Sequence, residues 1–141
     1  MKKRVLIIGS NGQLGSDLKS NSPSEFEIFN HTRDDCDITD HEKTSSYLDH
    51  IRPQVIVNTA AFHNTDKCEE DPDLSFSVNA SAVKLLAKYC HENEAVLAHI
   101  STDYVFGGGE TDLPFTEKSE PNPINAYGIS KLAGEQMVRA Y

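Results

Sequence analysis

Short apolar runs alternate along this chain with longer amphipathic segments. The short runs have the length of β-strands, and their composition favours a sheet that is covered on both faces. Their alternation with helix-like segments is typical of an α/β fold built around a parallel sheet. The predicted strands are Arg4–Ile8, Phe26–Asn30, Val55–Asn58 and Val96–Ser101.

Three longer segments repeat apolar residues at the spacing of a helix that buries one face. Thr39 and Glu42 have the spacing of a capping box, and Pro53 would stop the helix that begins there. An amphipathic helix at the end of the chain should pack on a sheet and be followed by another strand, so we expect part of the parent protein to be missing. The predicted helices extend from Thr39 to about Ile51, from about Asp73 to His91, and along an apolar stripe from Ile129 to Tyr141.

A glycine-rich loop follows the first predicted strand and precedes a helix. It reads Gly9-Ser10-Asn11-Gly12-Gln13-Leu14-Gly15, a G-x-x-G-x-x-G pattern. Glycines let the backbone turn tightly and approach a pyrophosphate, whose charge then lies at the positive end of the helix. The loop lacks the Lys-Ser/Thr pair of a P-loop, which disfavours hydrolysis of a nucleoside triphosphate. The pattern therefore predicts a dinucleotide-binding loop that includes Gly9, Asn11 and Gly12.

The residues after the second predicted strand bear on the choice between NADH and NADPH. An acidic side chain at this strand end would hold the ribose hydroxyls of NAD, but Asn30-His31-Thr32-Arg33 contains no carboxylate. Arg33 could instead pair with the 2′-phosphate of NADPH, and a solvated arginine is equally compatible with the pattern. Asp37 and Ile38 would lie close to an adenine in such a fold, although Asp37 could equally be a turn residue.

Tyr127 and Lys131 have the i, i+4 spacing that places a phenol and an ammonium group on one helical face. The neighbouring cation favours the phenolate form, so such a tyrosine can donate or accept a proton near neutral pH. Such pairs also occur by chance on many helix surfaces. Thr102 follows the fourth predicted strand at the carboxyl edge, where ligands of open α/β sheets bind. Its hydroxyl could hold a substrate carbonyl, or it could simply bond to the backbone.

The order of glycine-rich loop, strand-end threonine and Tyr-x-x-x-Lys resembles the extended short-chain dehydrogenase/reductases over nearly the whole chain. Within that group, the chain is similar to the dTDP-4-dehydrorhamnose reductases. The motifs that carry this resemblance are Gly12-Gln13-Leu14-Gly15, Asn58-Thr59-Ala60-Ala61, Asp66-Lys67-Cys68-Glu69, Val78-Asn79-Ala80, Ser101-Thr102-Asp103-Tyr104-Val105-Phe106, and Tyr127-Gly128-Ile129-Ser130-Lys131-Leu132-Ala133-Gly134-Glu135.

The resemblance implies a Rossmann-type fold, a doubly wound parallel sheet with helices on both faces, that binds NADPH or NADH. It implies that Tyr127 donates the proton, that Lys131 favours the phenolate and holds the nicotinamide ribose, and that Thr102 bonds the reacting carbonyl. The other implied positions are Gly12, Gln13 and Leu14 at the pyrophosphate, Asp37 and Ile38 at the adenine, Ala60 and Ala61 beside the cofactor, and Thr102 and Asp103 at the sugar.

The activity implied by this resemblance is the NAD(P)H-dependent reduction of the C4 keto group of dTDP-4-dehydrorhamnose to dTDP-L-rhamnose, in nucleotide-sugar and polysaccharide biosynthesis. Two other interpretations stay open. The chain also resembles the non-catalytic beta subunit of methionine adenosyltransferase, an NADP-binding regulatory subunit, and its fold suits an epimerase or dehydratase acting on another nucleotide-sugar. The matches at Gln13-Leu14-Gly15 and from Ser101 to Phe106 favour the reductase.

The chain departs from the family pattern in two respects. Phe62-His63-Asn64-Thr65 replaces the usual aromatic-Thr-x-Val on the sugar side, so His63 is either a substrate contact or a solvated loop residue. Members of the family are also much longer, and their second half grips the nucleotide-sugar. We therefore expect residues 1–141 to form an incomplete NAD(P)-binding Rossmann domain, truncated before the last strands and the substrate-binding part, that binds cofactor without turnover.

The charge and hydropathy of the chain argue against nucleic acids and membranes as partners. The 13 Lys and Arg residues against 22 Asp and Glu residues give a net charge of −9, which repels phosphate backbones and anionic membranes. No apolar run approaches the roughly 20 residues of a spanning helix, and Val5–Ile8 is too short for the core of an export signal. We therefore expect a cytoplasmic protein that binds neither nucleic acid nor membrane, and the family resemblance implies a nucleotide-sugar as its substrate.

The cysteines and carboxylates predict no metal site. Cys36, Cys68 and Cys90 share no Cys-x-x-Cys or zinc-ligand spacing, so we expect reduced thiols. Some members of the family depend on Mg²⁺, but no carboxylate cluster in this sequence can be assigned to that ion. A homodimer is compatible with the sequence.

Overall fold

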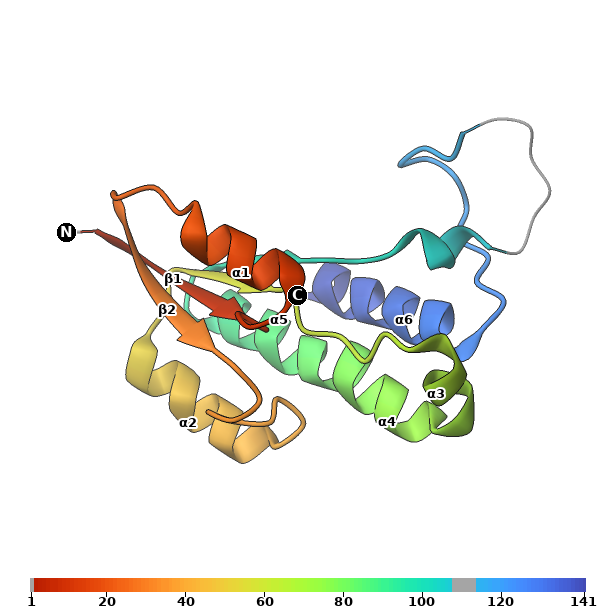
Figure 1. The fold of residues 1–141 in the computed structure, drawn as a ribbon, viewed down its shortest axis with the longest axis horizontal. Helices are drawn as coiled ribbons and strands as arrows, with labels where there is room; N and C mark the ends of the chain where they lie inside the picture. The colour runs from red at the N-terminus through yellow and green to blue at the C-terminus, as the bar shows by residue number, and fades with distance from the viewer. Residues whose placement is uncertain (1, 108–113) are drawn as a thin grey trace.

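A parallel four-stranded sheet with strand order β2-β1-β3-β4 forms the centre of the molecule (Figure 1). The structure, a computed structural model, describes residues 2–107 and 114–141. The four predicted strands are confirmed, except that β4 ends at His99 and not at Ser101, because its partner β3 ends at Asn58. The strands are β1 (Lys3–Ile8), β2 (Phe26–His31), β3 (Val55–Asn58) and β4 (Val96–His99).

The predicted helices are also confirmed. The long helix expected from Asp73 to His91 is made of α4, a π-helical turn and α5 in direct succession. The short helix α3 was not predicted, because its sequence TDKCEE carries no apolar stripe. The helical segments are α1 (Gln13–Ser20), α2 (His41–Ile51), α3 (Thr65–Glu70), α4 (Pro72–Phe76), the π-helical turn η1 (Ser77–Ser81), α5 (Ala82–Glu92), the 3-10 turn η2 (Asp103–Phe106) and α6 (Ala126–Ala140).

The first turn of α2 differs from the prediction. Asp40 is the N-cap residue, and its side chain accepts a hydrogen bond from the N–H of Lys43 at 3.1 Å. The hydroxyl of Thr39 instead donates to the carboxylate of Asp37 at 2.7 Å. The predicted capping box between Thr39 and Glu42 is therefore wrong, because a nearby carboxylate competes for the threonine hydroxyl.

The helices cover both faces of the sheet. The connection from β1 to β2 through α1 goes one way along the sheet, whereas the connections through α2 and α5 go the other way. Right-handed crossovers then place α1 on one face and α2 and α5 on the other. Figure 1 shows α1 and α2 on opposite sides of the strands, and α5 contacts both α2 and α6. The predicted doubly wound arrangement is confirmed.

The main core lies between the sheet and the helices α2 and α5. Leu6 and Ile8 of β1, Ile56 of β3, Leu48 of α2 and Leu86 of α5 are each at most 1% exposed and form one cluster. Burying a side chain of this size stabilises a fold by about 1.5–3 kcal/mol. This layer therefore fixes the strands whose carboxyl ends form the candidate site.

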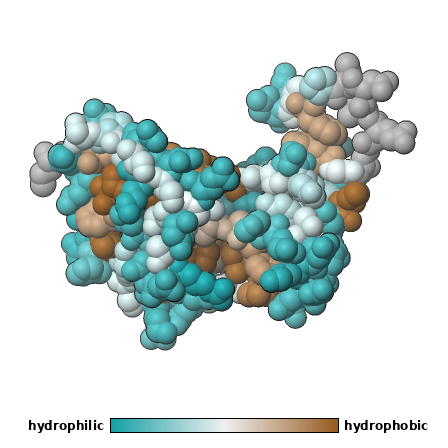
Figure 2. Space-filling model, in the orientation of Figure 1, coloured by the Kyte–Doolittle hydropathy of each residue, from teal (hydrophilic) through white to brown (hydrophobic). Residues whose placement is uncertain are grey.

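The surface mixes polar residues with separate apolar patches. The face shown in Figure 2 is mainly hydrophilic, with hydrophobic residues gathered in several places. The side chains of Ile124 and Val96 are 70% and 58% exposed. In the part of the chain that the structure describes, no helix has the length and hydropathy to cross a membrane.

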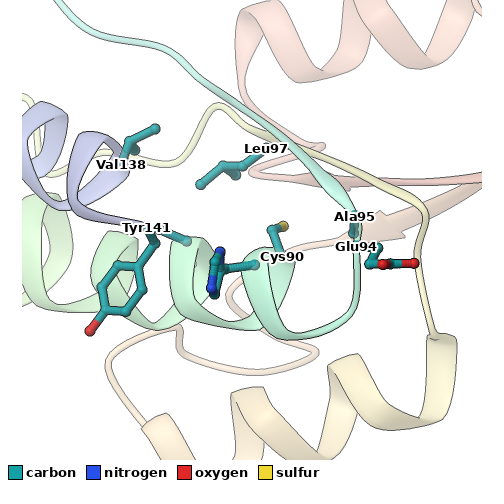
Figure 3. A pocket seen from close by; sticks show the side chains of 8 residues that line it. Cys90, Glu94, Ala95, Leu97, Val138 and Tyr141 are labelled. Atoms are coloured by element: carbon teal, nitrogen blue, oxygen red, sulfur yellow. The ribbon is translucent and has the colours of Figure 1, made fainter.

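A hollow of about 450 Å³ lies beside the start of β4, between the ends of α5 and α6. Cys90 and Leu97 line it from α5 and β4, and Val138 and Tyr141 line it from the end of the chain (Figure 3). This hollow is separate from the carboxyl edge of the sheet, where the sequence placed the candidate chemistry.

Gly15 packs directly against the backbone of the glycine-rich loop. A Cβ at this position would lie 2.2 Å from the carbonyl oxygen of Gly9 and 2.8 Å from the Cα of Ser10. We expect Gly15→Ala to lower the free energy of unfolding by about 2 kcal/mol, because the backbone must shift to admit the methyl group. Gly12→Ala is the matched control, since its Cβ would meet only the Gly9 oxygen, at 3.3 Å. Urea denaturation measures both variants, and equal stabilities would contradict this account.

Candidate functional site

The carboxyl edge of the sheet holds a cleft of about 510 Å³. It opens where β1 and β3 lie side by side, since the chain leaves these two strands toward opposite faces of the sheet. Such a switch point is where open α/β sheets bind their ligands. The volume is within the range of small-molecule and cofactor sites.

All residues that the sequence assigned to cofactor binding line this one cleft. Thr102 and Asp103, which were assigned to the substrate, are not among the residues that line it. The structure therefore brings the glycine-rich loop together with the Tyr127 and Lys131 pair, while the roles of these residues stay predictions. The lining residues named in advance are Gly9, Asn11, Gly12, Gln13, Leu14, Arg33, Asp37, Ile38, Ala60, Ala61, Tyr127 and Lys131.

The glycine-rich loop presents the start of α1 to the cleft. Gly9 has φ +80°, a conformation that favours glycine, and its N–H donates to the carbonyl of His31 at 3.0 Å. Gly12 is the N-cap residue of α1, and no side chain caps this helix. The first N–H groups of a helix lack partners within it and form a natural anion site. The start of α1 is therefore suited to an anion such as a pyrophosphate.

Arg33 and Asp37 form an ion pair at the edge of the cleft. The guanidinium lies 2.9 Å from the Asp37 carboxylate, and its side chain is 79% exposed. Partial burial opposes ionisation of Asp37, but hydrogen bonds from Thr39 and from Arg33 hold the pKa of this carboxyl below its ordinary value. Asp37 is thus a turn residue that also lines the cleft, and Arg33 is a solvated cation within reach of it.

The first turn of α6 is anchored to neighbouring segments, which places Tyr127. The side chain of Asn125 caps the helix by accepting the N–H of Gly128 at 2.8 Å, and Glu69 accepts the N–H of Ala126 at 2.6 Å. The ring of Tyr127 meets the ring of Tyr104 edge to face, with centroids 5.5 Å apart. These contacts hold the phenol at the wall of the cleft.

Lys131 is almost fully buried, with 2% of its surface exposed. Its Nζ donates a hydrogen bond to the carbonyl oxygen of Ile100 and lies 3.5 Å from Nε2 of His99. Burial lowers the pKa of Lys131 to about 8, against the opposing effect of the Glu135 charge. A lysine in this state exchanges its proton much nearer to neutral pH than an exposed one.

Thr102 is engaged in local hydrogen bonds. Its hydroxyl oxygen accepts the N–H of Tyr104 at 3.3 Å and caps the 3-10 turn η2. The hydroxyl also lies 3.3 Å from the carboxylate of Asp103. The structure thus shows the backbone-bonded arrangement, one of the two that the sequence left open.

Asn79 supports the wall of the cleft, a role that sequence reasoning missed. It lies in the π-helical turn η1 and is 1% exposed. Its amide accepts the N–H of Phe62 and donates to the carbonyl of Phe62, both at 2.9 Å, and it also donates to the hydroxyl of Ser130 at 3.0 Å. It therefore ties one wall of the cleft to α6. A π-helical turn has no sequence period of its own, although such turns are frequent at functional sites.

His31 and His63 also line the cleft. His31 ends β2 and is 2% exposed, and its ring packs edge to face on Tyr47 with centroids 5.0 Å apart. Among the described residues, its two ring nitrogens have no hydrogen-bond partner, and burial lowers its pKa. In the sequence, His31 directly follows the predicted strand Phe26–Asn30, and this position at a strand end is the signal that could have placed it at the carboxyl edge.

The described part of the chain contains three cysteines and other possible metal ligands. Cys36, Cys68 and Cys90 are free and buried. Within residues 2–107 and 114–141, no group of three or more His, Cys, Asp or Glu side chains is arranged to hold a metal ion.

Together, the fold and the site define a Rossmann-type α/β protein with a Tyr-x-x-x-Lys pair at the carboxyl edge of its sheet. The chain belongs to the family described as the RmlD substrate binding domain, whose model matches residues 2–141. The dTDP-4-dehydrorhamnose reductase of Mycolicibacterium smegmatis is 38% identical over 141 residues, which cover 99% of this chain and 42% of that protein.

Two solved structures agree with this assignment. The dTDP-4-dehydrorhamnose reductase of Bacillus anthracis, solved in complex with NADP, has a TM-score of 0.90 and 40% identity over 99% of this chain and 50% of its own. The dTDP-4-dehydrorhamnose reductase of Clostridium acetobutylicum has a TM-score of 0.92 and 40% identity over 97% of this chain and 49% of its own. The chain thus spans about half the length of the relatives that it matches.

Proposed function

We propose that residues 1–141 form the NAD(P)-binding part of a cytoplasmic reductase that converts dTDP-4-dehydrorhamnose into dTDP-L-rhamnose. The observation that carries this proposal is the single cleft in which the glycine-rich loop meets Tyr127 and Lys131. The names of the relatives supply the substrate and the reaction. The part that grips the nucleotide-sugar belongs to the remaining length of those relatives.

The residues of the cleft suit a nicotinamide dinucleotide. The start of α1 would receive the pyrophosphate, Asp37 and Ile38 would hold the adenine, and Ala60 and Ala61 would lie beside the cofactor, since all of these residues line the cleft. The exposed Arg33 can exchange its partner Asp37 for a 2′-phosphate, which favours NADPH over NADH. The B. anthracis relative was solved with NADP, which supports the same choice.

The residues of this chain handle the proton of the reaction. The bound dinucleotide supplies the hydride for the carbonyl carbon. Tyr127 donates the proton to the carbonyl oxygen as negative charge develops there, and Thr102 bonds the same oxygen. Lys131 is held by Ile100 within the wall of the cleft, where it would take part in binding the nicotinamide ribose.

Calorimetric titration of the chain with NADPH and with NADH tests this proposal. We expect NADPH to bind more tightly than NADH, and Tyr127→Phe to bind NADPH as the unmodified chain does, because the phenol serves the reaction more than the binding. We expect no measurable reduction of the sugar by the 141-residue chain alone. A folded chain that binds neither dinucleotide would refute the assignment of the cleft.

A further inference from the structure

The end of β4 brings a histidine against the buried lysine of the cleft. His99 ends β4 and Asn58 ends β3, and the two are partners in the parallel register. Partners in neighbouring strands direct their side chains to the same face of the sheet. Lys131 reaches this point from α6, which contacts β4. Three side chains far apart in sequence therefore meet at one point of the carboxyl edge.

The direction of the hydrogen bonds fixes the position of the His99 hydrogen. The side-chain oxygen of Asn58 accepts the N–H of Ala60 at 3.2 Å, so its amide nitrogen faces Nδ1 of His99 at 3.1 Å. An amide nitrogen only donates, and Nδ1 must therefore be the acceptor. The neutral ring then carries its hydrogen on Nε2. Burial and the charge of Lys131 lower the pKa of His99 to about 4, which keeps the ring neutral.

Nε2 of His99 faces Nζ of Lys131 at 3.5 Å, and Nζ donates to the carbonyl oxygen of Ile100. An ammonium group has only donors, so it cannot accept the Nε2 hydrogen, whereas the lone pair of a neutral amine can. Nζ of Lys131 therefore faces one acceptor, the Ile100 carbonyl, and one donor, the Nε2–H of His99. A neutral amine can bond to both, whereas an ammonium group can bond only to the carbonyl.

Two other titratable groups, Tyr127 and Glu135, lie one helical turn from Lys131 on α6. Glu135 favours the ammonium form by its negative charge, but its carboxylate is engaged by the hydroxyl of Ser101 and lies 3.4 Å from the Arg139 guanidinium. Tyr127 precedes Lys131 by one helical turn and lines the same cleft. Burial outweighs the Glu135 charge and lowers the pKa of Lys131, which is the direction that the hydrogen-bond pattern also favours.

We propose that His99, held by Asn58 with its hydrogen on Nε2, is a positioning residue that stabilises the neutral amine of Lys131 and so lets this lysine exchange a proton during turnover. The role of this proton exchange in turnover rests on the proposed reductase function. When Lys131 releases a proton, the amine that remains accepts the Nε2 hydrogen of His99.

NMR of the isotope-labelled chain tests the proposal without cofactor or substrate. Long-range ¹H–¹⁵N correlations should show Nε2 of His99 protonated and Nδ1 unprotonated between about pH 5.5 and 8. The Cε resonance of Lys131 should titrate with a pKa of about 8. A hydrogen on Nδ1, or a titration of Lys131 at its ordinary value of 10.5, would overturn the proposal.

A pair of variants separates the hydrogen bond from simple packing. His99→Gln keeps an acceptor for Asn58 and a donor for Lys131, so the pKa of Lys131 should stay in place. His99→Leu keeps the burial but removes the donor, and should raise this pKa by about one unit, a tenfold change in the dissociation constant. His50→Leu, at an exposed position of α2, is the control that should change nothing. An unshifted pKa in His99→Leu, or equal shifts in both His99 variants, would contradict the proposal.

Two further measurements separate a failure of this proposal from an unfolded variant and from a failure of the proposed function. Backbone spectra show whether each variant is folded, and the measurement on the unmodified chain decides the proposal alone if a variant is not. Calorimetric titration of the same samples with NADPH reports on the proposed function. A chain that has the expected His99 hydrogen and Lys131 pKa but binds no dinucleotide refutes the proposed function and leaves the proton arrangement standing.

Discussion

Gly12→Asp should weaken the binding of NADPH by at least about 100-fold, an effect of nearly 3 kcal/mol, while leaving the fold intact. Gly12 has φ −74°, which any residue adopts, and a Cβ there would meet only the Gly9 oxygen, at 3.3 Å. As the N-cap residue of α1, an aspartate would cap the free N–H groups of the helix and slightly stabilise it. Its carboxylate would then occupy the place where the pyrophosphate is expected, and would repel it.

Gly12→Asn is the matched control for this variant. Asparagine has the size of aspartate and is as good an N-cap residue, but it carries no charge. Calorimetry should therefore show a much smaller loss of affinity for Gly12→Asn, and urea denaturation should show similar stabilities for both variants. Equal losses of affinity in the two variants would mean that the size of the side chain, and not its charge, weakens the binding of NADPH. Unchanged NADPH binding in Gly12→Asp would show that the glycine-rich loop does not bind the pyrophosphate.

Lys131→Met should raise the free energy of unfolding at pH 7 by about 2 kcal/mol, because methionine fills a similar volume without placing a charge in the core. In the folded chain, burial lowers the pKa of Lys131 from 10.5 to about 8. At pH 7 the lysine is charged in both states, and the folded state bears the full cost of the buried ammonium, about 3 kcal/mol. The lost hydrogen bond to Ile100 offsets part of the gain.

The pH dependence gives this prediction a definite sign. Between about pH 8 and 10.5 the unfolded chain holds a proton on Lys131 that the folded chain has released, so stability rises with pH across this window. The advantage of Lys131→Met should therefore shrink as the pH rises from 8 and vanish above 10.5. Urea denaturation at several pH values measures the difference. Lys88→Met, on the exposed surface of α5, is the control and should show no such change. A constant difference between Lys131→Met and the unmodified chain would contradict the buried charge.

Local features of this protein could be predicted from its sequence. The strands and the long helices follow from the spacing of apolar residues, which is set by the geometry of a few successive residues. The glycine-rich loop was recognisable because it stands between a strand and a helix. The i, i+4 spacing of Tyr127 and Lys131 placed them on one face of α6, and both line the cleft.

Competition between near neighbours was harder to predict. Thr39 has the spacing of a capping residue, yet its hydroxyl bonds to Asp37 and Asp40 caps α2 instead. Thr102 stands at the expected strand end, yet its hydroxyl caps a 3-10 turn. In each case two hydrogen-bond partners were available within a few residues, and the backbone conformation selected one of them.

The sequence by itself determined the fold class, the glycine-rich loop between β1 and α1, and the identity of the side chains at the carboxyl edge, because these depend on periodicity and on the order of elements. Only the tertiary structure decided the charge state and the partners of those side chains. Lys131 is buried against Ile100 and His99, and Asn79 joins Phe62 to Ser130, through contacts between segments that are distant in the chain. Desolvation and hydrogen-bond direction depend on what packs around a group, and no local pattern of residues encodes that packing.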